Sequence, residues 1–357
     1  MPFFRLRRGW LWSVALLAGL LIAAPVPATA DQKEDKKQKE KVSKEQKQEA
    51  EALVKLVDEA MKGQPAPADF TLGWRNDFMK SRDLSVYVPF TLSIDPSAIN
   101  SRSLGMYLRV VAKTPPPAAP ATKEAGTETK AAPAPPLFAF EDIHLVELKD
   151  PVKGQPYRFS RAIQVRGGEY DVYLAVRERK LGKNQKPKVT VHKQTLAVPD
   201  YANGQLTTST VIVADAVEPL AAGLSPEEQL EKPYTIGTAQ ITPATDDQFA
   251  KNQDLNLIFF IYNPTLKEKK PDLTVEYKFH RKTAEGEKYF NKTEPTKLSA
   301  ETLPPTFDLD AGFQLSAPLS VPLALFPEGD YRLEIEITDN FAQKKLTREV
   351  FFTVLGP

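Results

Sequence analysis

The chain of 357 residues contains no cysteine and only three histidines. The absence of cysteine excludes a disulfide framework, a thiolate metal site and a cysteine nucleophile. His144, His192 and His280 lie far apart, without the short spacing of a metal site. G-x-S-x-G, P-loop and G-x-G-x-x-G motifs are also absent from the sequence. We therefore predict no enzymatic activity, no cofactor and no metal site.

The chain also lacks an excess of charge of one sign. It has 47 basic and 46 acidic residues, for a formal net charge of +1. Without a basic excess there is no electrostatic footprint for nucleic acid, so no nucleic-acid partner is predicted. The hydrophobic content of 41% is sufficient for a packed core, which argues against a wholly disordered chain.

Residues 1–30 have the pattern of an export signal. Three arginines precede an apolar run over 11–24, and the small residues 28–30 form a cleavage site. The apolar run is about 14 residues long, shorter than the roughly 20 that a membrane-spanning helix needs. This length favours a cleaved signal over a retained membrane anchor.

We expect cleavage between Ala30 and Asp31, which leaves no membrane span. The cleavage removes three of the 47 basic residues and none of the 46 acidic ones, so the remaining chain carries a formal charge of −2. The predicted location is periplasmic or extracellular. The sequence does not distinguish these two locations, and it does not indicate an oligomeric state.

A charged helical arm is predicted over residues 31–66. Residues 31–49 are almost wholly polar, and Gly63 and Pro65 end the pattern. A solvated helix whose last turns dock on the rest of the protein is favoured over a coiled coil, because fewer than two apolar heptads are present. The apolar stripe on which this prediction rests comprises Ala50, Leu53, Val54, Val57 and Met61.

Beyond residue 66 the sequence is typical of β-strands, with short runs of β-branched and aromatic residues between Gly, Pro, Asn and Asp. We predict a mainly β fold in which two tandem immunoglobulin/fibronectin-III-like β-sandwiches, 67–203 and 204–357, follow an N-terminal helix. The predicted strands are 84–94, 104–112, 138–148, 157–165, 170–177 and 189–198 in the first sandwich. Those in the second are 206–214, 234–241, 255–262, 273–281, 313–325, 331–338 and 346–355.

Two segments interrupt the strands. Residues 114–136 contain seven prolines and no aromatic or large aliphatic residue, which predicts a disordered Pro/Ala-rich insertion. A proline-rich ligand for another protein is the less favoured alternative. Residues 225–231 are predicted to form a short helix, with Ser225 as N-cap and Glu228 completing a capping box.

An internal repeat supports two copies of one sandwich. Gly-acid-Tyr sequences at 168–170 and 329–331 each open a penultimate strand, and a further strand follows each of them. The pattern resembles a tyrosine corner, in which the ring fills the edge of the core and the hydroxyl binds a backbone group. We therefore assign structural roles to Tyr170 and Tyr331.

The strand over 255–262 is apolar on both faces. Leu255, Leu257, Phe259 and Ile261 are expected to face the core. The opposite face is a candidate partner patch, although cover by another part of the chain is favoured because large exposed apolar patches are rare. That face comprises Ile258, Phe260 and Tyr262.

Several segments resemble exported β-sandwich proteins known from acidobacteria. This group includes GWxTD-domain proteins and proteins described with von Willebrand factor A-related domains. The resemblance covers about residues 70–357, and it implies a sandwich fold and no catalytic residues. The segments that carry it are VYVPFTLSIDPS, TLAVPDYANGQLTTSTVIVAD, KPYTIGTAQITPATDDQFAKNQDLNLIFFIYNP and PLALFPEGDYRLEIEITDNFAQKKLTREVFFTV.

Two functions remain open from the sequence. The favoured one is an exported, non-catalytic binding or scaffold protein of the bacterial cell envelope, whose partner is a protein or an envelope polysaccharide. The alternative is a secreted hydrolase, or an accessory domain of one, with a site carried on loops.

Overall fold

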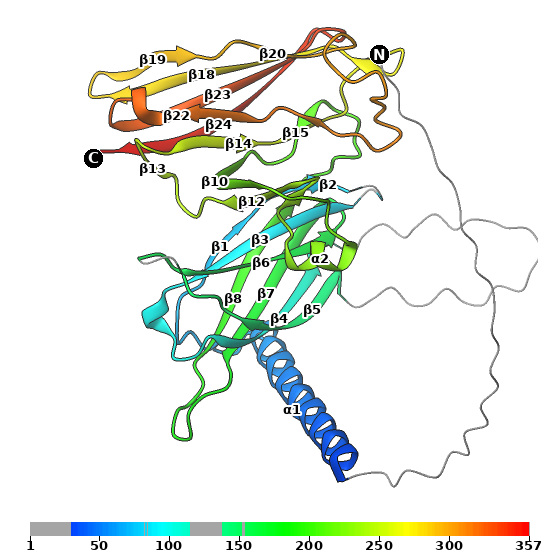
Figure 1. The fold of residues 1–357 in the computed structure, drawn as a ribbon, viewed down its shortest axis with the longest axis vertical. Coiled ribbons are helices and arrows are strands. Elements are labelled where there is room, and N and C mark those ends of the chain that lie inside the picture. Colours follow the sequence, from blue (N-terminus) through cyan, green and yellow to red (C-terminus); the bar gives the residue numbers. More distant parts are fainter. Residues whose placement is uncertain (1–29, 82, 84, 115–137, 152–153, 357) are drawn as a thin grey trace, which may run out of the picture. The chain divides into compact units, whose positions relative to one another are not determined.

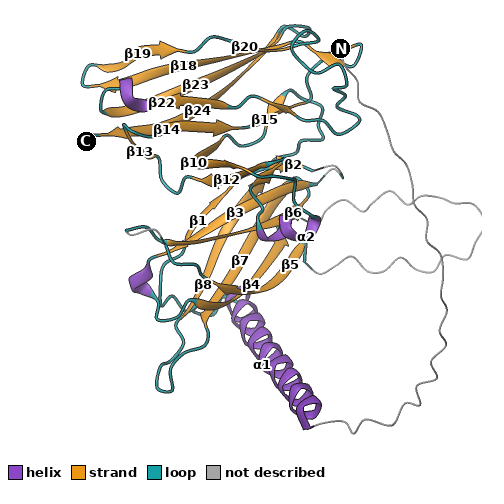
Figure 2. Cartoon of the chain, viewed as in Figure 1, coloured by secondary structure: helices purple, strands orange, loops and turns teal. Residues whose placement is uncertain are grey.

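The computed structural model describes residues 30–356 except 82, 84, 115–137 and 152–153, and it describes the side chains of the N-terminal helix from residue 46. Residues 1–29 of the predicted signal and 115–136 of the predicted insertion therefore lie outside the described residues. The fold is mainly β, as predicted (Figure 2). Within the described residues, no helix is both long and apolar enough to cross a membrane.

The N-terminal helix is α1 (Ala30–Met61). Its apolar stripe docks through its last turns, where Leu53 and Val57 are fully buried against Tyr107, Tyr173 and Ala175. These three residues belong to the outer face of a sheet, so that sheet is covered on both sides at this place. The coiled-coil alternative stays a prediction.

The first half of the β structure contains two sheets (Figure 1). In one sheet, β3 is central and pairs with β1, β2 and β6. The other sheet has the order β5-β4-β7-β8. The elements are β1 (Gly73–Asn76), β2 (Met79–Lys80), β3 (Val86–Ile94), η1 (Pro96–Ala98), β4 (Ser103–Ala112), β5 (Phe140–Glu147), β6 (Tyr157–Val165), β7 (Gly168–Glu178) and β8 (Val189–Val198).

The second half also contains two large sheets, with the orders β11-β12-β10-β14-β22 and β13-β24-β23-β18-β19. Strand β20 pairs with β18, and two small sheets have the orders β21-β15-β9 and β16-β17. The first elements are β9 (Thr207–Thr208), β10 (Ile212–Pro219), α2 (Pro226–Glu231), β11 (Thr235–Ile236), β12 (Ala239–Pro243), β13 (Gln248–Ala250), β14 (Asp254–Ile258) and β15 (Phe260–Tyr262). The others are β16 (Leu266–Lys267), β17 (Lys270–Pro271), β18 (Leu273–Thr283), β19 (Gly286–Lys292), β20 (Thr296–Leu298), β21 (Leu315–Ser316), β22 (Leu319–Pro322), η2 (Leu323–Leu325), β23 (Gly329–Asp339) and β24 (Lys344–Leu355).

The two halves repeat one pattern of strand pairing. The order β5-β4-β7-β8 in the first half corresponds to β19-β18-β23-β24 in the second, and β1-β3-β6 corresponds to β10-β14-β22. Gly168 and Gly329 open the matching strands β7 and β23 with φ angles of 151° and 134°. Side chains with a Cβ rarely adopt such angles, which explains the glycine at the start of each repeat. The assignment to an immunoglobulin/fibronectin-III-like fold stays a prediction.

Two hydrophobic cores lie on opposite sides of the segment 254–262. Leu255, Leu257, Phe259 and Ile261 belong to the core of the second half, as expected from their alternation. Ile258, Phe260 and Tyr262 pack in or against the core of the first half. Residues Glu49–Pro357 form one compact unit, and the boundary predicted between residues 203 and 204 stays a prediction.

The same segment departs from the single strand that its apolar run predicts. Strand β14 ends at Ile258 and pairs with β10 and β22, whereas β15 begins at Phe260 and pairs with β9 and β21. Phe259 therefore marks a change of sheet. Short helix α2 begins as expected, because the Ser225 side chain accepts the N–H of Glu228 and the Glu228 carboxylate accepts the N–H of Ser225.

Candidate functional site

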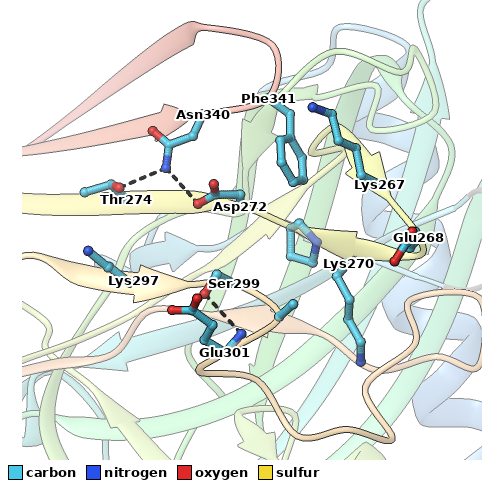
Figure 3. Close-up of a pocket in the computed structure, with 12 residues that line it drawn as sticks. Lys267, Glu268, Lys270, Asp272, Thr274, Lys297, Ser299, Glu301, Asn340 and Phe341 are labelled. Atoms are coloured by element: carbon cyan, nitrogen blue, oxygen red, sulfur yellow. Dashed lines mark hydrogen bonds between the residues drawn. The ribbon is translucent and has the colours of Figure 1, made fainter.

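A pocket of about 760 Å³ lies in the second half, at the ends of β18 and β20 (Figure 3). Its side chains are mostly engaged with one another. Asn340 Nδ2 donates to Asp272 Oδ1 at 2.8 Å and to Thr274 Oγ1 at 3.1 Å. The Lys267 ammonium lies 4.3 Å from the centroid of the Phe341 ring. These contacts fasten the turn after β23 to β18 and to the β16–β17 hairpin.

The buried carboxylate of Asp339 supports the same turn. It accepts the N–H groups of Thr265, Phe341 and Ala342 at 2.8 to 3.1 Å. Burial raises the pKa of Asp339, but these hydrogen bonds outweigh burial and hold the pKa below its usual value. The pocket is therefore built around groups that stabilise loops.

A second depression, the β5–β6 groove, has a volume of about 740 Å³. It lies between the C-terminal end of β5, the first half of β6 and the segment that carries α2 and β12. Its lining comprises residues 145–149, 158–161, 231–234 and 240–243, together with Thr91, Glu218 and Leu220. Val146, Leu148, Phe159, Tyr234 and Ile241 in this lining also belong to the core of the first half, so the floor of the groove is apolar.

Two arginines of β6 line the β5–β6 groove. Arg158 donates to Asp215 Oδ2 at 2.8 Å and to Thr245 Oγ1 at 2.7 Å. Arg161 donates to the carbonyl of Ser160 at 2.8 Å and pairs with Glu231 at 3.2 Å. The Nε atoms of both arginines are buried without a hydrogen-bond partner among the described residues. Each arginine therefore keeps one N–H donor unpaired, and that donor is buried beneath the groove surface.

Arg161 occupies a position that alternation assigns to the core. It lies between the buried residues Phe159 and Ile163 on the inner face of β6, the edge strand of its sheet. An inward-pointing charge is one way in which proteins mark and protect a sheet edge. Arg161 is not among the residues singled out from the sequence, although a charged residue at a position where the strand alternation calls for an apolar one could have drawn attention to it.

A buried carboxyl lies behind the floor of the groove. Asp77 is 1% exposed, and the Tyr234 hydroxyl lies 2.8 Å from its Oδ2 and 3.1 Å from the carbonyl oxygen of Pro89. Burial raises the pKa of Asp77 to about 6, although the bond from Tyr234 and the charge of Arg75 act in the opposite direction. Because Asp77 is not among the residues that line the groove, its carboxyl has no direct contact with the groove space.

The candidate partner patch is corrected by the structure. Phe260 and Tyr262 are buried, and Ile258 packs against the core of the first half. The Tyr262 hydroxyl accepts the N–H of Lys80 at 3.0 Å, and its ring lies 4.9 Å from that of Tyr201. Cover by the chain itself removes this face from solvent, so these three residues do not form a partner surface.

Tyr170 and Tyr331 have equivalent environments. Both rings are buried, and each hydroxyl donates to the carbonyl four residues earlier, Arg166 at 2.8 Å and Pro327 at 2.7 Å. Burial raises the pKa of both tyrosines. This is the geometry of a tyrosine corner, and it assigns both residues to the fold.

The other residues singled out in the sequence are not brought together. His144 Nε2 lies 2.7 Å from Asp142, His192 bonds Gln194 at 3.4 Å and His280 Nδ1 lies 3.8 Å from Glu287. No group of three or more His, Asp or Glu side chains in the described part of the chain is arranged to hold a metal ion. Ala30 and Asp31 open α1, and the predicted cleavage between them stays a prediction.

Comparisons with known proteins give no family. No protein-family model and no curated protein matches the chain. A solved structure of trypsin-activated alpha-2-macroglobulin from Escherichia coli matches with 13% sequence identity and a TM-score of 0.21. The match covers 82% of this chain and 17% of that one, so the chain spans less than a fifth of its length. A likeness of this size carries no argument about fold or function.

Proposed function

We propose that this protein is an exported, non-catalytic binding or scaffold protein of the bacterial cell envelope. The observation that carries the proposal is the β5–β6 groove, whose apolar floor is bordered by Arg158 and Arg161. An apolar floor with a few charged groups at its border is typical of a recognition site. The export-type N-terminus and the resemblance to exported sandwich proteins support the location.

The groups that line the groove support a binding role over a catalytic one. Core residues form its floor, and the ion pairs of Arg158 with Asp215 and of Arg161 with Glu231 hold its walls together. Asp77, whose raised pKa suits a general acid, lies behind the floor and does not line the groove. The groove therefore offers binding groups at its surface, while Asp77, the carboxyl whose pKa is raised toward neutral pH in the described part of the chain, is enclosed.

Capture of an envelope component tests this function. The full chain is expressed in a bacterial host, purified in its exported form, immobilised and exposed to an envelope extract. We expect a specific protein or polysaccharide to be retained by the wild type, and retention to fall about tenfold or more with Arg161→Met, which keeps the aliphatic stem and removes the charge.

The matched control is Arg332→Met. Arg332 also pairs with carboxylates, those of Glu287, Glu334 and Glu349, but it is not part of the groove. Circular dichroism establishes that both variants are folded. Equal retention by the two variants would contradict the proposal, and turnover of a hydrolase substrate panel without any retained component would favour the secreted hydrolase instead.

A further inference from the structure

Strand β5 is an open edge next to the groove. Among the described residues it pairs with β4 alone. Just beyond the paired residues Ser103 and Glu147, the N–H of Leu148 donates to the carbonyl of Arg102. Because the direction alternates along a strand, the even-numbered residues of β5 direct their backbone N–H and C=O groups toward β4. In an antiparallel pair the alternate residues direct theirs outward. The outward residues of β5 are Glu141, Ile143, Leu145 and Glu147.

Several other strand edges among the described residues are covered or charged. The parallel strand β13 covers part of β24, and residues 67–69 bond the start of β8 through the backbone of Val189 and Val191. Strand β19, which corresponds to β5 in the repeat, carries Lys288 and Lys292. Lysines on an edge strand discourage pairing with another chain. Strand β5 has no lysine, and its Ile143 and Leu145 are each 41% exposed.

The charge of β5 selects the kind of partner. The exposed face of the strand ends in the carboxylates of Glu141 and Glu147, which pair with Arg109 and Lys180 and stay 45% and 60% exposed. Antiparallel pairing with a second copy of β5 centred on His144 places Glu141 opposite Glu147, and like charges in opposite positions destabilise a strand pair. A segment of another protein that places basic residues opposite Glu141 and Glu147 would be attracted at both positions.

We propose that the β5 edge takes an extended segment of a second protein as an added strand. The segment is apolar at alternate positions, which contact Ile143 and Leu145, and carries Lys or Arg at its flanks, opposite Glu141 and Glu147. Strand addition of this kind gains affinity from main-chain hydrogen bonds and specificity from alternate side chains. Leu145 and Glu147 also line the β5–β6 groove, so the partner continues from the strand into the groove. This inference rests on the proposed function and names the mode of binding.

A synthetic peptide tests the inference. The probe is fluorescein-labelled Lys-Thr-Val-Thr-Val-Thr-Lys, whose lysines and valines lie on one face, and binding to the full chain is followed by fluorescence anisotropy. We expect Ile143→Asp and Leu145→Asp to weaken binding about tenfold or more, because each places a charge where an apolar contact forms. A peptide with Glu at both ends is expected to bind more weakly by a similar factor.

The matched control is Leu325→Asp, at a leucine that is 89% exposed outside the edge and the groove. Because the chain has no cysteine, Leu145→Cys also allows a disulfide to a peptide with a central cysteine, with no competing thiol. Absence of peptide binding, equal binding by the edge variants, or a dimer of the chain that Ile143→Asp dissociates each overturns the inference. If the wild type still captures the envelope component in those cases and Arg161→Met does not, the proposed function is supported and strand addition at β5 is wrong.

Discussion

The buried carboxyl of Asp77 gives the protein a pH-dependent stability with a defined sign. Its pKa is about 6 in the folded protein, above its ordinary value of 3.8. The native state therefore binds more protons than the unfolded chain between these values. The contribution of Asp77 to the free energy of unfolding falls as the pH rises through this window and becomes constant above it, with a total change of about 3 kcal/mol.

Replacement of Asp77 by Asn is expected to remove this slope. Asp77→Asn stays neutral at all pH values and keeps an acceptor for the Tyr234 hydroxyl. We predict a free energy of unfolding similar to that of the wild type near pH 4, and higher by up to about 3 kcal/mol at pH 7. Urea denaturation between pH 4 and pH 8 measures both. If the free energy of unfolding of Asp77→Asn declines with pH as steeply as that of the wild type, a group other than Asp77 causes the decline.

The two tyrosine corners are expected to stabilise each half by similar amounts. Tyr170→Phe and Tyr331→Phe each leave a backbone carbonyl without the hydroxyl donor, which costs about 1 kcal/mol of unfolding free energy. Tyr289→Phe, at a tyrosine that is 59% exposed, serves as the control and is expected to have almost no effect. Chemical denaturation of the three variants provides the comparison. Equal unfolding free energies for all three variants would show that the two corner hydroxyls do not stabilise the fold.

At the scale of elements, the docking of α1 depends on a glycine of β4. A Cβ built on Gly105 lies 3.2 Å from Leu53 Cδ1 and 3.1 Å from Glu49 Oε1, so the helix packs where a side chain would otherwise stand. Gly105→Val is expected to displace the end of α1 while the strand itself tolerates valine. Cleavage of residues 49–61 by a protease then becomes faster.

Gly182→Ala is the control for this prediction. The nearest atom to a Cβ at Gly182 is Gln185 Oε1, at an ordinary contact distance of 3.5 Å. We expect its proteolysis to match that of the wild type. If Gly105→Val also protects residues 49–61 from the protease, docking of α1 does not need the close approach of Leu53 and Glu49 to Gly105.

The sequence predicts the long elements well, because their alternation is regular. Strands β6 (Tyr157–Val165) and β8 (Val189–Val198) have the predicted bounds. The change of sheet at Phe259 was not predictable, since 255–262 alternates without a break and only tertiary packing divides it. Very short strands such as β1 were missed because four residues carry too little periodicity. The seven-residue β19 was also missed, because its residues are mostly polar and exposed. The strand predicted over 313–325 was wrong, since this segment is divided among β21, β22 and η2.

The candidate site was harder to predict than the fold. The β5–β6 groove joins residues near 147, 160 and 232 that no local pattern connects. The apolar face of 258–262 is covered by the chain itself, the alternative that the sequence favoured over a partner patch, but alternation does not identify which residues cover it. Arg161 shows what sequence analysis can add, since an arginine between the apolar residues Phe159 and Ile163 is the kind of inward-pointing charge that occurs on edge strands.

At the scale of the whole molecule, the segment 254–262 couples the two cores. Phe259 packs into the core of the second half and Phe260 into that of the first, although they are neighbours in sequence. We therefore predict a single thermal unfolding transition for Glu49–Pro357. Phe259→Ala and Phe260→Ala each cost about 3–5 kcal/mol and lower the same melting temperature.

Calorimetry of the wild type and the two variants tests this coupling. Independent halves would give two transitions, with each variant shifting only one of them. A single transition in all three proteins is the result expected for a scaffold in which the groove is held by both halves, because β6 contacts the 212–245 segment through Arg158.

We propose that an envelope partner binds along β5 and the β5–β6 groove. Hydrogen–deuterium exchange of the full chain, measured with and without the captured envelope component, locates the binding surface. We predict slower exchange in 141–149 and 158–161, where the outward backbone groups of β5 and the walls of the groove lie. Unchanged exchange in both segments, with protection confined to β18, β23 and β24, would contradict it.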